Sequence, residues 1–366
     1  MLFSFFALAV MDGANLKIRL AGLNIPLAVL AIVTIIGVIV ALIEPNTNYN
    51  RLIAYSITMC ALGSAAILGL NSPKSKKNIL PYYIIFAVMA SIAVLIWYLE
   101  PLLINKNWAA LQILFPIFLL QLKGAYKLNL ILLYLLSISF SMLVFSRGAL
   151  LMGIIALLST SFLPILFKSK KIYILTKFTV IIAPIFMIIF SFWLVDFYRT
   201  ETYDILNRWS LEYFQRSLTS FRIVMWEQTV YYGSENLFLG GGITDDVLSL
   251  NYFTSFGAVH NLWFDYYIRF GLFGIISIAL IMAYFAVGSV SSPANGLVCT
   301  PVYLALLLAM IVYNMGGLTH WPGSVFTWYL FGLIMKRNNN QNDSRNRPEI
   351  YRHKIKCPLS LYYEKK

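Results

Sequence analysis

Long runs of apolar residues, each about the length needed to cross a bilayer, constrain the fold of this chain more than any other feature. Of its 366 residues, 60% are apolar and only 12% are charged, whereas soluble domains carry about 25% charged residues. A membrane core of about 30 Å is crossed by roughly 20 apolar residues in a helix. A soluble protein of two or three domains is therefore excluded, and we predict an all-α polytopic membrane protein.

These apolar runs predict ten transmembrane helices, within a range of ten to twelve because a further short apolar run occupies residues 1–10. The predicted spans are 21–43, 52–70, 80–103, 108–122, 128–145, 149–167, 172–195, 266–290, 298–316 and 322–335. They divide the chain into four parts, which are an N-terminal bundle at 1–195, a large loop at 196–265, further spans at 266–335 and a basic tail at 336–366.

The positive charges are distributed unevenly between the two sides of the predicted bundle. Alternate short loops and the tail together hold 20 of the 28 Lys and Arg residues. Because cytoplasmic loops carry the excess of Lys and Arg, we expect both termini and these loops to be cytoplasmic. The formal charge of +13 is then a property of topology. Nucleic acid is excluded as a partner, because the basic residues stand between long apolar runs, whereas a nucleic-acid-binding protein needs them in an exposed patch.

Tryptophan gives a second indication of the same topology. Five tryptophans fall at span ends that the charge distribution places outside, where this residue typically anchors a helix at the membrane–water interface. They are Trp97, Trp108, Trp193, Trp263 and Trp321.

Only the connection at 196–265 is long enough to form a site of its own, and it lies on the outer side. It contains no Lys, four Arg and nine acidic residues. Aromatic and aliphatic residues recur at helical spacing over 205–232, which predicts one or two amphipathic helices on the outer membrane surface. The glycines at 240–242 interrupt this pattern. A loop of this length is usually functional or disordered, and its aromatic content argues against disorder.

Two arginines could bind an anion at the outer surface. Arg147 stands in the very short turn Phe145-Ser146-Arg147-Gly148 between two spans. It is either an interface residue whose charge reaches water or a guanidinium that clamps phosphate. Arg222 opens Arg222-Ile223-Val224-Met225-Trp226-Glu227, and it is either a surface residue, alone or paired with Glu227, or part of the same anion site.

Two histidines on the outer side are candidates for a general base, because imidazole titrates near neutral pH. His260 precedes Asn261 at the start of the span after the large loop, and His320 lies in Thr319-His320-Trp321-Pro322. Asp245 and Asp246 form an acidic pair without a third ligand at suitable spacing, so we expect no metal. The sequence also lacks a phosphate-binding loop and a dinucleotide fingerprint, and we expect no cofactor.

Three stretches in this order resemble the O-antigen ligase and O-antigen polymerase family of bacterial membrane glycosyltransferases. They are Phe145-Ser146-Arg147-Gly148-Ala149-Leu150-Leu151, then Arg222 to Trp226 running on to Gly240-Gly241-Gly242, and His260-Asn261-Leu262-Trp263 with Gly271-Leu272-Phe273-Gly274. The similarity covers roughly residues 130–290, around one large outer loop.

The resemblance implies a metal-independent glycosyl transfer at the periplasmic face of the inner membrane. The donor is a glycan on undecaprenyl pyrophosphate, the acceptor is a sugar hydroxyl, and a chain-length regulator is a further partner to consider. Carried over to this sequence, Arg147 and Arg222 would hold the pyrophosphate and His260 would activate the hydroxyl. Asn261, Glu227 and His320 would be supporting residues.

Within this family we predict an O-antigen polymerase, which joins repeat units that are both carried on lipid. One alternative is an O-antigen ligase, which transfers the glycan to lipid A–core. Another is a polysaccharide transporter or flippase, which predicts functional charges inside the spans. The predicted span interiors are almost free of charge, which favours the enzyme.

Overall fold

The computed structural model describes residues 22–43, 49–72, 80–99, 106–144, 146–214, 217, 222–243, 261–313 and 321–345. Every regular element within these ranges is a helix, and the helices are numbered α2 to α13. The apolar run at 1–10, the tail beyond Arg345 and both candidate histidines on the outer side lie outside these ranges.

A helix stands at each of the ten positions where the sequence predicts a span. These helices are α2 (Asn24–Ile43), α3 (Tyr49–Asn71), α4 (Leu80–Leu99), α5 (Lys106–Lys123), α6 (Lys127–Leu143), α7 (Arg147–Leu166), α8 (Lys170–Phe197), α11 (Leu262–Ser289), α12 (Pro293–Tyr313) and α13 (Trp321–Arg345). Six of them, α2, α3, α7, α8, α11 and α12, are long and apolar enough to cross a membrane by length and composition alone. The prediction of an all-α polytopic membrane protein is confirmed.

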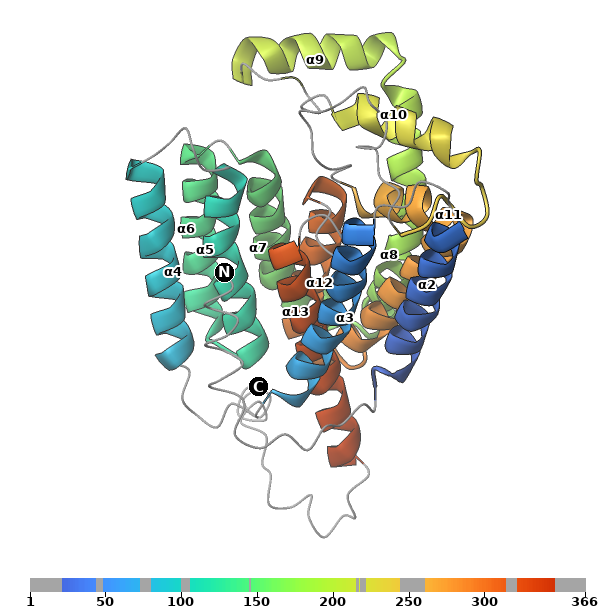
Figure 1. Cartoon of the computed structure of the whole chain (residues 1–366). Helices are drawn as coiled ribbons and strands as arrows, with labels where there is room; N and C mark the ends of the chain where they lie inside the picture. The colour runs from blue at the N-terminus through green and yellow to red at the C-terminus, as the bar shows by residue number, and fades with distance from the viewer. Residues whose placement is uncertain are drawn as a thin grey trace, which may run out of the picture.

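The long helices form one bundle (Figure 1), with α4, α5, α6 and α7 on one side and α2 with α3 on the other. Close contact between backbones joins α3 to α13. A Cβ on Gly69 or on Gly332 would collide with the backbone of the partner helix, at Tyr329 and at Ala66 respectively. Small residues allow this approach, which is how helices associate where lipid removes the usual hydrophobic driving force.

The loop between α8 and α11 folds into two helices, as its periodicity predicts. These are α9 (Glu201–Phe214) and α10 (Arg222–Gly233). Both lie beyond one end of the bundle, which we call the loop end (Figure 1). On α9 the side chains of Ile205 and Trp209 are more than half exposed, whereas Tyr203 and Ser210 on another face are buried. Large apolar side chains therefore lie on the surface of α9 that faces away from the protein.

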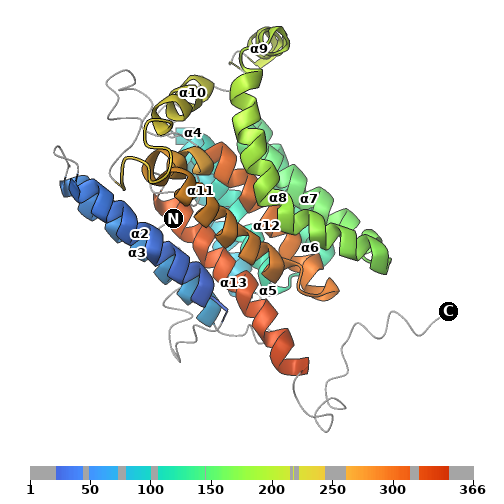
Figure 2. The same ribbon diagram turned by 90° about the vertical axis from the view of Figure 1, so that its right-hand side faces the viewer.

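Helix α8 carries this loop because it is longer than a bilayer is thick. Its 28 residues span about 42 Å at 1.5 Å per residue, against about 30 Å for a hydrocarbon core. Figure 2 shows α8 running the length of the bundle and leading directly into α9.

Helix α11 has the same length but is divided in two, which the predicted span 266–290 does not anticipate. Gly271 has φ 59° and ψ −150° and interrupts the helix. The first part, Leu262–Phe270, is a short segment that we call the entry segment, and the second part crosses the bundle. All of the entry segment is buried. The helix therefore begins at Leu262, four residues before the predicted start at 266, and it begins in protein rather than in lipid.

The last helix also continues further than predicted. α13 extends to Arg345, past the expected end of the span at 335. Nη1 of Arg337 donates a hydrogen bond to the carbonyl oxygen of Leu122, 2.5 Å away, at the end of α5. A cation at this position stabilises the negative end of a helix dipole, so the first residues of the basic tail are part of the folded protein.

Candidate active site

Arg147 is the first residue of α7 and faces the large loop. The residue is half-buried, and Nη1 of its guanidinium donates a hydrogen bond to the carbonyl oxygen of Ser217, at 3.1 Å. Ser217 is itself buried, at 6% exposure, between α9 and α10. The contact joins residues 70 positions apart and ties the loop to the N-terminus of α7.

Arg222 occupies the equivalent position in α10, as its first residue, and is also half-buried. Neither α7 nor α10 has an acidic residue in its first turn. The N-terminus of a helix carries a partial positive charge and N–H groups without an intrahelical acceptor. Each arginine therefore adds a full positive charge where the backbone is already positive, an arrangement that favours an anion between them.

The chain itself limits how far these two arginines lie apart. Ser217 and Arg222 are five positions apart in the sequence, and a fully extended chain of that length reaches at most about 18 Å. Since Arg147 contacts Ser217 directly, the two helix N-termini belong to the same region of the loop end.

A separate apolar cluster at the loop end, which we call the second cluster, places α10 against the entry segment of α11. Its buried members are Val195, Ile223, Trp226, Phe264 and Ile268, from α8, α10 and α11. The rings of Trp226 and Phe264 have centroids 5.7 Å apart, and Phe192 of α8 packs edge-on against Phe264 at 5.1 Å. This packing fixes the start of α10 relative to the start of α11.

Asn261 caps α11. Its Oδ1 accepts a hydrogen bond from the backbone N–H of Trp263 at 2.9 Å, and its Nδ2 donates to Oγ of Ser191 in α8 at 3.2 Å. The residue is completely buried, so it is fixed from both sides. His260 precedes it directly and, like His320, lies outside the described residues.

Glu227 pairs with Arg199. Both Nε and Nη2 of Arg199 donate to Oε1 of Glu227, the first at 3.0 Å, and this hydrogen bonding raises the pKa of Arg199. Because the arginine is largely exposed, the pair is a surface link between the end of α8 and α10. The structure thus gives Glu227 a partner other than Arg222, which the sequence had offered as an option.

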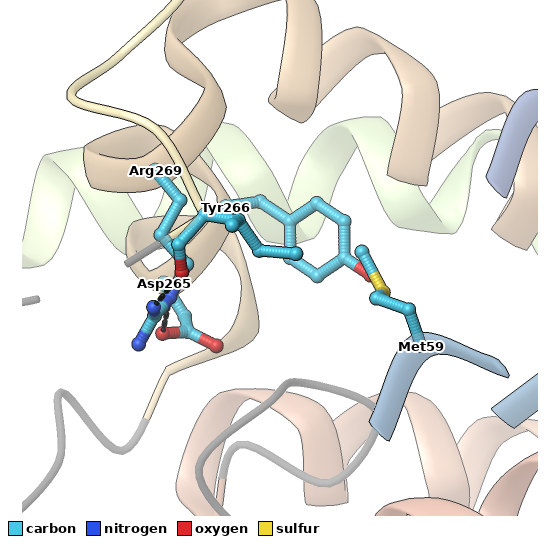
Figure 3. A network of polar contacts seen from close by, with 5 residues as sticks. Met59, Asp265, Tyr266 and Arg269 are labelled. Carbon is cyan, nitrogen blue, oxygen red and sulfur yellow. Dashed lines mark hydrogen bonds and ion pairs between the residues drawn. The ribbon is translucent and has the colours of Figure 1, made fainter. Parts of the chain in front are cut away.

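The most deeply buried charges in the described part of the chain were not predicted from the sequence. Asp265 and Arg269 are both 0% exposed, and Nε of Arg269 donates to Oδ1 of Asp265 at 2.9 Å. Figure 3 shows this pair with Tyr266, whose hydroxyl points to the sulfur of Met59 in α3. The sequence assigned Asp265 to the aqueous loop. Its i, i+4 spacing from Arg269 was the signal for a pair on one helix face.

Trp263 differs from its predicted role in the same way. Its side chain is 0% exposed, so it belongs to the protein core, whereas an interface anchor contacts lipid headgroups. Trp193 on α8 is half exposed and fits the anchor role. The side chains of Trp97, Trp108 and Trp321 lie outside the described side chains.

The glycines that follow α10 form a close backbone contact with the kink of α11. The N–H groups of Gly241 and Gly242 donate to the carbonyl oxygens of Ile268 and Arg269, both at 3.0 Å. On the other side of the kink, the N–H of Leu272 donates to the carbonyl oxygen of Leu237 at 2.8 Å. We call residues 237–243 the strap. They pair with the backbone that the kink leaves without helical partners.

Glycine is required on both sides of this contact. A Cβ on Gly271 would lie 2.5 Å from the carbonyl carbon of Phe238, and one on Gly240 would collide with the backbone of Arg269. Both residues also have positive φ, 59° and 69°, which L-residues rarely adopt. The two glycine motifs of the sequence are thus parts of one structural feature.

Residues 132–279 match the family model described as O-antigen ligase. The matched segment runs from α6 into α11 and includes both candidate arginines, the strap and the entry segment. No curated protein and no solved structure matches the chain.

Proposed function

We propose that this chain, which matches the family model described as O-antigen ligase over residues 132–279, is an O-antigen polymerase, a membrane glycosyltransferase. In this proposal it acts at the periplasmic face of the bacterial inner membrane. It transfers a glycan from undecaprenyl pyrophosphate to a sugar hydroxyl of a second repeat unit, which is also carried on lipid.

The proposed reaction exchanges one bond at the anomeric carbon for another. The acceptor oxygen attacks that carbon, the bond to the pyrophosphate oxygen breaks, and undecaprenyl pyrophosphate leaves with the bonding electrons. The acceptor proton passes to a base, for which we propose His260, since a neutral imidazole can accept it near neutral pH. Negative charge therefore develops on the pyrophosphate as the bond breaks.

Two positively charged helix ends would stabilise that charge. We assign this role to Arg147 and Arg222, because a planar guanidinium matches phosphate oxygens in a bidentate manner. Preorganised charge of this kind supplies a large part of transition-state stabilisation in many enzymes. The observation that carries the proposal is the hydrogen bond from Arg147 to Ser217, which holds the loop that leads to Arg222 against the start of α7.

The second cluster supports the assignment of the base. It packs the beginning of α10, which carries Arg222, against the entry segment, whose capping residue Asn261 follows His260 directly. The leaving-group site and the base would then approach the reacting carbon from neighbouring helix ends at the loop end of the bundle. This position suits a donor whose lipid stays in the membrane while its glycan is in water.

The description of the matched family favours one second candidate, an O-antigen ligase. We prefer the polymerase because the outer loop, residues 196–265, is modest in length. Both enzymes break the same donor bond, and they differ only in the acceptor, which is a lipid-linked repeat for the polymerase and lipid A–core for the ligase.

A deletion strain distinguishes these candidates. Loss of a polymerase leaves lipopolysaccharide with core plus a single repeat, whereas loss of a ligase leaves bare core. Complementation with Arg147→Ala, Arg222→Ala or His260→Ala should fail. Arg208→Ala is the matched control, because it removes an exposed arginine of α9 and should restore the wild-type pattern. An unchanged pattern in the deletion strain contradicts both candidates.

A parallel variant, His320→Ala, tests which histidine is the base. If His260 accepts the proton, His320→Ala retains long glycan and His260→Ala does not. The reverse result transfers the role of base to His320 and leaves the rest of the proposal intact.

A further inference from the structure

The buried pair formed by Asp265 and Arg269 joins three separate parts of the protein. Besides Asp265 on the same helix, Arg269 uses Nη1 to donate to the carbonyl oxygen of Ile243 at the end of the strap, 2.6 Å away. Its guanidinium carbon lies 4.4 Å from the centre of the Tyr55 ring in α3, within the range of a cation–π contact. One side chain therefore connects α11, the strap and α3.

Stability alone is a poor explanation for these charges. Removing two ions from water costs several kcal/mol each, and apolar residues of similar volume often stabilise a protein equally well or better. Intramembrane charges with partners are expensive and frequently functional. The role of the ion pair is therefore inferred from the parts of the protein that it holds in place. Its contacts surround the kink at Gly271.

The kink lies at one end of the entry segment, so a small rotation at the kink displaces the opposite end. The nine residues of the segment, Leu262–Phe270, are about 13 Å long at 1.5 Å per residue. A rotation of about 10° at Gly271 moves the far end by about 2 Å, by simple geometry on that length. That end carries Asn261 and, next to it, His260. A displacement of about 1 Å in a reacting group can lower a rate about 100-fold.

We propose that the Asp265–Arg269 pair is a positioning device, which sets the angle of the entry segment at the kink and thereby places the base of the glycosyl transfer. The inference rests on the proposed function, because it takes His260 as that base. Arg269 and Asp265 are positioning residues, since they are buried on the far side of the cap from the reacting groups.

Four backbone hydrogen bonds join the strap to α11, and they would not fix this angle by themselves. They act on residues close to the kink, which have little effect on the position of the far end. These residues are Ile268, Arg269, Leu272 and Phe273. Asp265 is midway along the entry segment, one helical turn from Asn261. The ion pair thus transmits the strap position, through Ile243 and Arg269, to the half of the segment next to His260.

The test is a double variant, Asp265→Leu with Arg269→Met, in the full-length protein reconstituted in vesicles. Because apolar side chains of similar size replace both ions, we expect the Tm to stay the same or rise. The kcat for elongation of a lipid-linked repeat should fall at least about tenfold, with the KM for the donor changed by less than about threefold. A purely structural pair would not separate kcat from Tm in this way.

Arg269→Lys is the second variant, in case the double variant does not fold. It keeps a positive charge beside Asp265 but lacks the planar fork that reaches both Asp265 and the Ile243 carbonyl. A smaller decrease in kcat in the same direction is expected. Leu306→Ala, in the core of α12, is the control for loss of stability, and it should lower the Tm while kcat stays near wild type.

Amide hydrogen exchange gives a readout that needs no activity. In the double variant, protection should decrease over 262–270 and over the strap, while α12 stays protected. Wild-type kcat together with unchanged protection in a folded double variant overturns the inference. If wild-type protein does not elongate the substrate, the proposed function is wrong. Amide hydrogen exchange still tests the positioning role in that case, and unchanged protection in the double variant overturns it.

Discussion

Helices α8 and α11 are equally long, at 28 residues each, and both are apolar enough to cross a membrane, yet they occupy opposite environments. In α8 only Val180, Pro184, Ser191 and Val195 are buried. In α11, 20 residues are buried, including a complete ion pair. α8 therefore presents most of its surface to lipid and carries a loop, whereas α11 is a core element whose exact shape matters.

Apolar composition identifies both helices as membrane spans, whereas the candidate site lies beside the features of α11 that are not apolar helix. α8 has no positive-φ residue and no buried charge, while α11 has a glycine kink, two buried charges and a buried polar cap. Each of these features has a cost in free energy, and each lies at the end of α11 next to His260. Substitutions that remove these features from α11 should destabilise the protein more than matched substitutions elsewhere, most of them in α8. They are given from the largest expected loss of stability to the smallest.

The largest effect is expected for Asp265→Ala. It leaves the buried guanidinium of Arg269 without its carboxylate, and breaking a buried pair in this way costs about 3–5 kcal/mol. Thermal unfolding of purified protein should show a large decrease in Tm. Asp196→Ala, in the last turn of α8, is the matched control on the other helix. Similar decreases for both variants would mean that the pair in α11 has no special role.

A smaller effect is expected for Gly271→Ala. The new Cβ meets the fixed backbone of Phe238 at 2.5 Å, and φ of 59° is unfavourable for alanine. We expect a loss of about 1–3 kcal/mol. Gly124→Ala separates the two causes, because Gly124 has φ of 88° but no heavy atom within 4 Å of its Cβ position. If Gly124→Ala destabilises the protein as much, the strap contact contributes nothing.

The two helix caps give a third comparison. Asn261 caps α11 from a fully buried position, and Ser169 caps α8 through a longer, exposed hydrogen bond from the N–H of Ile172, at 3.5 Å. Removing an N-cap costs about 0.5–2 kcal/mol. We expect Asn261→Ala at the upper end and Ser169→Ala at the lower end, measured by denaturant unfolding in detergent. Only the former should also lower the rate of glycan elongation.

The smallest effect is expected on the lipid-facing surface of α8. Phe186 is 60% exposed, and exposed positions away from special features tolerate substitution within about 0.5 kcal/mol. Phe186→Leu should leave both Tm and elongation near wild type. Phe264→Leu provides the contrast, because this ring is completely buried in the second cluster. Equal tolerance at both positions would contradict the assignment of α8 to lipid and α11 to the core.

The sequence predicted the helices because their signal is local. Ten apolar runs of suitable length indicate ten helices whatever surrounds them, and the aromatic spacing over 205–232 likewise indicates α9 and α10. What escaped prediction depends on contacts between distant segments. The hydrogen bond from Arg147 to Ser217 spans 70 positions and ends on a backbone carbonyl, which no side-chain pattern encodes.

The start of α11 also could not be predicted from local sequence patterns, because its burial depends on contacts with distant segments. A charge near the end of an apolar run normally marks the edge of the membrane, so Asp265 was assigned to the loop and Trp263 to the interface. Both side chains are instead 0% exposed. The strap packs against the kink of α11, and this approach is possible only because Gly240 and Gly271 lack side chains at the point of contact. Each glycine motif was visible in the sequence, but their mutual contact depends on the fold.

The central claim, that Arg147 and Arg222 hold the leaving group of a glycosyl transfer, is tested most directly by elongation in a purified system. Wild-type protein in vesicles with a lipid-linked repeat unit should produce a ladder of longer lipid-linked glycans. Arg147→Ala and Arg222→Ala should each slow this reaction at least about 100-fold, while Arg208→Ala elongates at the wild-type rate. No ladder from wild-type protein, or a ladder formed at the wild-type rate by the double arginine variant, would contradict the account.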